Sequence, residues 1–160
     1  MLKLYKRVGD TLHYWETWDK NSKAGIIHWG IVGQTGEGKE VASGLLANFR
    51  KKIQEEVDQK LKDGYAQIDT DEHYTLLIEY TVDGMGTAED VEKRTRLQDK
   101  MDEVLGWTGL GHCDGGSIGS GTMEVCCLVV DFDVAKHVIG QALKDTEFAN
   151  YTRIFDEDNE

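Results

Sequence analysis

The most constraining feature of the sequence is an apolar stripe with a four-residue period, formed by Leu45, Phe49, Ile53, Val57 and Leu61. Charged side chains separate its members, so the segment predicts an amphipathic helix with one face in a core. Ser43 precedes the stripe as the expected N-cap, and Gly64 follows it as a residue suited to ending a helix.

The residues before this helix predict an antiparallel sheet. Apolar residues and turn residues alternate in a way that favours strands at 2–8, 12–18, 25–32 and 39–42. The chain contains no proline, so its turns depend on glycine, asparagine and aspartate. We expect these turns at Gly9-Asp10, in the polar stretch 19–25 and in the glycine-rich stretch 33–38.

An acidic joint at 69–72 separates this half from a second pattern of elements. Strands are expected at 74–82, within 110–118, at 123–132 and at 151–155, with helices beginning at the caps Thr87 and Asp133. The order βαββαβ predicts a ferredoxin-like sandwich, in which two helices cover one face of an antiparallel sheet. The predicted class is therefore α+β, with domains at 1–68 and 73–156 and an acidic tail at 157–160.

Residues 4–68 contain a motif, Trp29-Gly30-Ile31-Val32-Gly33 followed by Gly36, between a predicted hairpin and the amphipathic helix. Further along, Phe49 lies on the helix, and Lys60, Gly64 and Tyr65 close it. This combination resembles the WGR domain, in which a Trp-Gly-Arg strand precedes a glycine turn, a short strand and a helix. The resemblance implies an antiparallel sheet with one helix. It covers about two-fifths of the chain.

The chain departs from that family at the namesake arginine, which is replaced by Ile31. In DNA-binding WGR domains of the poly(ADP-ribose) polymerases, the tryptophan and arginine of the motif help to engage DNA ends and neighbouring domains. Isoleucine cannot form a charge-assisted hydrogen bond to a phosphate. The resemblance therefore implies the fold more strongly than nucleic-acid binding, and the polymerase activity is not carried over.

Charge is distributed unevenly along the chain. The formal net charge is −12; residues 1–68 contain 11 Lys and Arg against 9 Asp and Glu, and residues 69–160 contain 7 against 21. A field of this sign repels phosphate backbones and favours basic partners. It also agrees with ordinary solubility, which is the plainer interpretation.

Two groups of residues are candidates for contact with a partner. Basic charge interleaved with aromatic rings is typical of a binding surface, and a glycine-rich stretch at 106–121 can present side chains to a partner. The candidate partner-binding residues are Trp29, Gly30, Arg50, Lys51, Lys52, Trp107 and His112. The alternative for the three basic residues is a solvated helix face, paired at i,i+4 with Glu55 and Glu56.

Catalytic, metal and cofactor sites are not predicted. His112, Cys113 and Asp114 are neighbours in sequence, so their side chains point apart on an extended chain. The cysteines at 113, 126 and 127 lack the spacing of a zinc site. The glycine-rich stretch leads into a strand and lacks the lysine of a phosphate-binding loop, so a mobile hairpin edge is the better interpretation.

These observations favour a non-enzymatic binding or adaptor protein with a protein partner. The alternatives are an immunity protein that inhibits a basic toxin enzyme, and a nucleic-acid-binding WGR module. The longest apolar run is Val125 to Val130, far shorter than a membrane span, and the N-terminus lacks the apolar core of a signal peptide. We therefore expect a cytoplasmic protein with no membrane partner.

Overall fold

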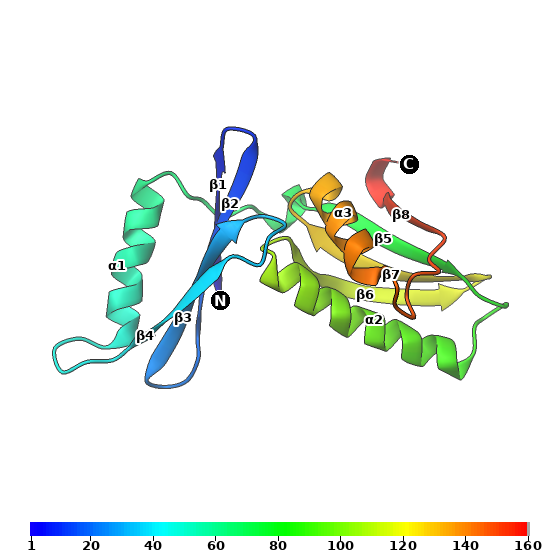
Figure 1. Ribbon diagram of the computed structural model, residues 1–160, viewed down its shortest axis with the longest axis horizontal. Coiled ribbons are helices and arrows are strands. Elements are labelled where there is room, and N and C mark those ends of the chain that lie inside the picture. Colours follow the sequence, from blue (N-terminus) through cyan, green and yellow to red (C-terminus); the bar gives the residue numbers. More distant parts are fainter. Residues whose placement is uncertain (160) are drawn as a thin grey trace. The chain divides into compact units, whose positions relative to one another are not determined.

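The computed structural model describes residues 1–159 and confirms the α+β class (Figure 1). The chain forms two compact units, Met1–Ile68 and the segment from Asp69 onward. Each unit has its own four-stranded antiparallel sheet. No helix within the described residues is both long and apolar enough to cross a membrane.

The first unit is a meander of four strands with one helix. Strands β1 (Leu2–Val8), β2 (Thr11–Asp19), β3 (Ala24–Ile31) and β4 (Glu37–Ala42) pair in sequence order. Helix α1 (Phe49–Lys62) contacts β3 and β4. The strands lie within a few residues of the predicted ranges, because their period of two points apolar residues to one side.

The core of the first unit lies between the sheet and α1. Its buried members are Leu4, Trp15, Ile27, Phe49, Ile53 and Val57. Trp29 lies opposite Trp15 in the ladder between β2 and β3 and packs against this core as a partly buried side chain. Phe49, Ile53 and Val57 of the predicted stripe are therefore core residues, and the stripe sets the face of α1 that meets the sheet.

The predicted start of α1 is wrong. Asn48, not Ser43, is the N-cap, and its Oδ1 atom accepts a hydrogen bond of 2.9 Å from the Lys51 amide. Ser43 instead uses its Oγ atom to accept from the Phe49 amide at 3.0 Å. Because the helix begins at Phe49, Leu45 lies before it and is exposed, and Leu61 in the last turn is half-exposed.

The end of α1 is as predicted. Gly64 has a φ of 93°, a conformation that costs glycine little. The Tyr65 amide donates to the Lys60 carbonyl at 3.0 Å, and the Gly64 amide donates to the Leu61 carbonyl at 3.2 Å. This pair of bonds is the Schellman arrangement, which satisfies carbonyls left open at a helix end.

The second unit has the element order βαββαβ that the sequence predicts. In chain order its elements are β5 (Tyr74–Thr81), α2 (Ala88–Trp107), β6 (Gly111–Gly119), β7 (Thr122–Val129), α3 (Phe132–Leu143) and β8 (Arg153–Asp156). The strands are arranged β6-β7-β5-β8, and every neighbouring pair is antiparallel. Helix α2 contacts β6 and β7, α3 contacts β5 and β8, and the helices contact each other. The ferredoxin-like assignment stays a prediction.

Buried side chains from both helices meet alternate residues of the sheet. Leu97, Met101 and Leu105 of α2 are fully buried, as are Ala135, Ile139 and Leu143 of α3. Every second residue of β7 is buried, which places its other residues on the opposite face. Val91, predicted to point inward from α2, is 45% exposed because it belongs to the first turn, before the buried stretch.

The ends of these elements confirm one predicted helix cap and correct another. Thr87 and Asp90 form a reciprocal capping box at the start of α2. Asp131, not Asp133, caps α3, because its side chain accepts from the Val134 amide at 3.0 Å. The predicted acidic tail begins as the 3-10 helix η2 (Glu157–Asn159), which contacts β5. A second short helix, η1 (Thr70–Glu72), occupies the predicted acidic joint.

The glycine-rich stretch forms the edge strand of the second sheet and one arm of a hairpin, as the prediction of a hairpin edge requires. Strand β6 pairs with β7 through a two-residue turn at Ser120-Gly121, where both residues have positive φ. A Cβ atom at Gly116 would lie 2.5 Å from the Glu124 carbonyl oxygen and 3.2 Å from Cδ of Arg94. The absence of a side chain there lets the long side chains of α2 lie directly on the strand.

We expect Asn48→Ala to lower the free energy of unfolding of the first unit by about 1 kcal/mol, because the Lys51 amide loses its acceptor. Urea denaturation of the full chain measures this change. Gln54→Ala, at an exposed position in the middle of the same helix, is the control and should change stability by a few tenths of a kcal/mol. Equal effects of the two substitutions would show that Asn48 does not cap α1.

Candidate functional site

The first two candidate residues serve the sheet of the first unit. Trp29 packs against its core. Gly30 neighbours the turn that follows β3, and a Cβ atom there would lie 2.9 Å from the Gly36 Cα and 3.1 Å from the Tyr14 hydroxyl. The Trp-Gly pair therefore joins β3 tightly to the glycine turn.

The three basic candidates share the first turn of α1 but have different surroundings. Arg50 forms an ion pair of 2.7 Å with Asp19, and its guanidinium lies 4.7 Å from the centre of the Phe49 ring. The Lys52 Nζ atom donates to the Ala42 carbonyl at 2.9 Å. Lys51 is exposed and forms no ion pair with any residue in the described range 1–159.

The expected pairing of these basic residues with the glutamates of α1 is wrong. Glu56 pairs with Lys39 of β4 at 2.8 Å, and Arg50 reaches Asp19 of β2. The sheet supplies these partners, Lys39 from the edge strand β4 and Asp19 from the end of the interior strand β2. This leaves the Lys51 ammonium group free for another anion.

A short loop before α1 places two leucines in solvent. We call residues 43–48 the leucine loop; Leu45 and Leu46 are both fully exposed. Three hydrogen bonds shape the loop: Ser43 N to the Lys23 carbonyl at 2.9 Å, Gly44 N to the Ala47 carbonyl at 2.9 Å, and the bond from the Phe49 amide to Ser43. The loop has a defined structure that holds both leucines away from the core.

The sequence did not predict this loop, because the four-residue period places Leu45 on the helix face. Leu46 fits neither the helix period nor a strand period. Asn48 was the available signal, since asparagine is favoured at N-caps and a cap at 48 excludes both leucines from the helix. Exposed leucines are common as single residues, but an adjacent, fully exposed pair on a hydrogen-bonded loop makes this loop a candidate contact surface.

A polar network is buried on the face of the first sheet that lies away from α1. Glu16 and His28 are each 3% exposed. The His28 Nδ1 atom lies 2.8 Å from the Glu16 Oε1 atom, and Nε2 lies 2.6 Å from the Thr35 carbonyl oxygen. A carbonyl can only accept, so Nε2 carries a hydrogen. Both ring nitrogens are thus engaged, which makes the ring a structural link between β2, β3 and the glycine turn rather than a general base.

Tyr14 extends this network. Its hydroxyl donates to the Gln34 carbonyl at 3.0 Å, and its ring centre lies 5.2 Å from that of His28. Burial, reinforced by the nearby Glu16 carboxylate, raises the pKa of Tyr14 to about 12. The neutral phenol is therefore the stable form, and it fixes the turn that follows the Trp-Gly pair.

The other two candidates belong to the second unit. Trp107 is the last residue of α2 and is 51% exposed, and His112 is an exposed residue near the start of β6. Trp107 comes before the β6–β7 hairpin, and His112 lies in the first strand of that hairpin, at the edge of the sheet.

The cysteines of the second unit form a cross-strand arrangement. Cys113 of β6 lies opposite Cys127 of β7, and a bulge follows between Cys113 and Gly115. The Asp102 side chain accepts the Cys113 amide at 2.8 Å, so α2 satisfies the backbone at the bulge. A hydrogen bond with the Cys127 thiol lowers the pKa of Cys113 and raises that of Cys127. Cys126 points to the opposite face, where burial raises its pKa to about 11.

Within residues 1–159, no three histidine, cysteine, aspartate or glutamate side chains converge in a way that suits a metal ion. Comparisons with protein-family models, with curated proteins and with solved structures found no match to this chain. The resemblance of residues 4–68 to the WGR domain therefore stays a prediction that rests on the motif and on the order of elements.

We expect Glu16→Ala to lower the free energy of unfolding by about 3 kcal/mol, because it leaves the buried His28 ring without its partner. Glu16→Gln keeps an acceptor oxygen for Nδ1 and should cost clearly less. Urea denaturation of both variants measures the difference. Equal losses would show that volume, rather than the hydrogen bond to His28, determines the role of Glu16.

Cys113 should be the first cysteine to react with iodoacetamide at neutral pH, because the thiolate is the nucleophile and only its pKa is lowered. Peptide mass spectrometry after short exposures gives the order of modification. Cys127→Ala removes the hydrogen bond and should slow the reaction of Cys113. Faster modification of Cys126 in the native chain would contradict this assignment.

Proposed function

We propose that this chain is a binding protein whose first unit attaches to a partner protein through the leucine loop. The observation that carries the proposal is the full exposure of Leu45 and Leu46 on a loop that hydrogen bonds hold in shape. Burying a leucine side chain contributes about 1.5–3 kcal/mol. A preformed loop also loses little conformational entropy on binding, which favours affinity.

The charges around the loop define the contact surface of the partner. Lys51 and Lys52 lie in the first turn of α1, directly after the loop, and Lys23 lies at its base, where its carbonyl accepts the Ser43 amide. An apolar pair surrounded by lysines fits an apolar groove bordered by carboxylates. The sequence favoured a basic partner because of the acidic second half; the loop belongs to the basic first half, so the partner's contact surface is acidic.

A protein groove suits the loop better than an anionic membrane. Stable attachment to a membrane requires two signals, and even a single myristoyl chain gives only marginal binding. Two leucine side chains carry less apolar surface than such a chain. A protein groove surrounds both leucines and therefore gains more from the same two residues.

The test begins with a photo-crosslinking amino acid at position 45 of the full chain, expressed in its native cells, and the same amino acid at exposed position 91 as the control. A protein captured only from position 45 is purified and its affinity measured by calorimetry. We expect Leu45→Ser with Leu46→Ser to weaken binding by at least about 100-fold, from the loss of two buried leucines. Lys51→Glu should also weaken binding, and this loss of affinity should be larger at low salt than at high salt.

Val91→Ser is the matched control, because Val91 is an exposed apolar residue of the second unit, and it should leave the affinity unchanged. An unchanged affinity of the double leucine variant would contradict the proposal. So would leucine-dependent sedimentation of the native chain with vesicles of phosphatidylserine and phosphatidylcholine, because this would identify a membrane as the partner.

A further inference from the structure

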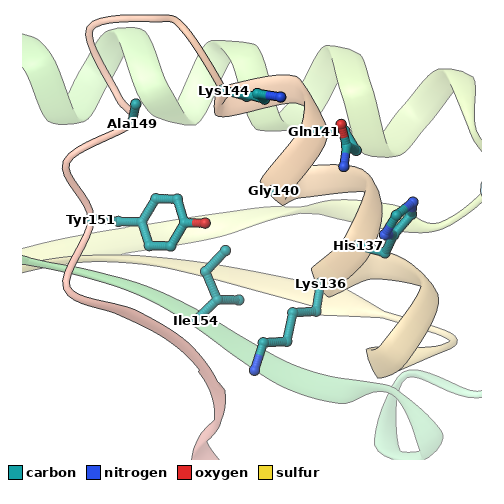
Figure 2. A pocket seen from close by; sticks show the side chains of 8 residues that line it. All are labelled: Lys136, His137, Gly140, Gln141, Lys144, Ala149, Tyr151 and Ile154. Carbon is teal, nitrogen blue, oxygen red and sulfur yellow. The ribbon is translucent and has the colours of Figure 1, made fainter.

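A cavity of about 420 Å³ lies in the second unit between α3 and the chain that leads into β8 (Figure 2). Its walls are formed by Lys136, His137, Gly140, Gln141, Lys144, Ala149, Tyr151 and Ile154. Figure 2 shows the Tyr151 ring reaching toward α3, with its hydroxyl directed at Gly140. The volume is in the range of sites that hold small molecules.

Each polar side chain that lines this cavity can donate a hydrogen bond, and no carboxylate is among the lining residues. The polar residues are two lysines, a histidine, a glutamine and Tyr151; the Nζ atom of Lys136 lies 5.9 Å from the centre of the Phe132 ring. Lys136 and Lys144 are two turns apart, about 12 Å along the helix axis, with Gly140 midway between them. Their flexible four-carbon stems can bring both charges to a ligand at Gly140.

This concentration of positive charge contrasts with the rest of the unit. Residues 69–160 contain 7 Lys and Arg against 21 Asp and Glu. Two arginines of this unit, Arg96 and Arg153, form ion pairs with glutamates. Lys136 and Lys144 form no ion pair within residues 1–159. A cationic cavity in an acidic unit selects its ligand by charge.

Gly140 is an independent indication of a binding site. Glycine in a helix interior costs about 1 kcal/mol relative to alanine. Packing does not require it here, because the nearest heavy atom to a Cβ at this position would be the Tyr151 hydroxyl oxygen at 3.8 Å, an ordinary contact distance. What the missing side chain provides is open space in the cavity wall between the two lysines.

We propose that this cavity binds a small organic anion, whose phosphate or carboxylate group is held by Lys136, Lys144 and the Tyr151 hydroxyl. Ala149 and the buried Ile154 form the apolar part of the wall, and the carbon skeleton of the ligand packs against them. The site is separate from the leucine loop, which belongs to the first unit, so neither proposal depends on the other.

The test is a titration of the isotopically labelled full chain with phenyl phosphate and with benzoate, followed by amide NMR shifts. We expect shifts centred on Gly140, Tyr151 and Ile154. Lys136→Gln with Lys144→Gln should weaken binding at least about tenfold, and Lys100→Gln, a lysine of α2 outside the cavity, should change it less than twofold. Gly140→Leu places a side chain in the cavity with a good helix former, so it should abolish binding and keep the fold.

Three results would overturn the proposal. The first is no shift at these residues with either probe at concentrations on the order of 10 mM. The second is binding of inorganic phosphate as tight as that of phenyl phosphate, which would show that the apolar wall has no role. The third is tighter binding of an acidic peptide than of either probe, which would identify a protein segment as the ligand.

Discussion

The hydrogen bond from the Lys51 amide to the Asn48 side chain determines how the first unit divides its apolar residues. It fixes the first turn of α1, and the four-residue period then directs Phe49, Ile53 and Val57 into the core. Leu45 and Leu46 come before the cap and cannot join that face. The same bond therefore defines both the packed side of the unit and the exposed pair on which partner binding is proposed.

The second unit depends on a different constraint, the close approach of α2 to β6. Glycines in β6 leave room for the long side chains of the helix, so Arg94 lies over Gly116. Asp102 then accepts the Cys113 amide at the bulge. These contacts order an edge strand that has few side chains of its own to pack, and they bring Cys113 opposite Cys127. Backbone contacts thus replace the side-chain packing that usually specifies a strand.

The sequence predicted the elements well because their apolar periods are strong. The α+β class, the strand and helix order and the end of α1 at Gly64 all follow from periods of two and four and from glycine chemistry. The start of α1 was missed because Leu45 continues the period across the true cap. The partners of Arg50 and Glu56, and the cavity between α3 and β8, depend on residues distant in sequence, and no local pattern reports such contacts.

The two proposed sites share a physical property: each contains residues that the fold alone would not favour. Two adjacent leucines in water forgo the stability that burial would contribute, and a glycine inside α3 costs stability relative to alanine. The buried Glu16 and His28 are different, since each costly group is matched by a partner inside the protein. Residues that the fold alone does not favour are expected at binding sites, because a ligand can supply the missing contacts. This criterion supports the two proposed binding sites, the leucine loop and the lysine-lined cavity, and assigns the histidine network to the scaffold.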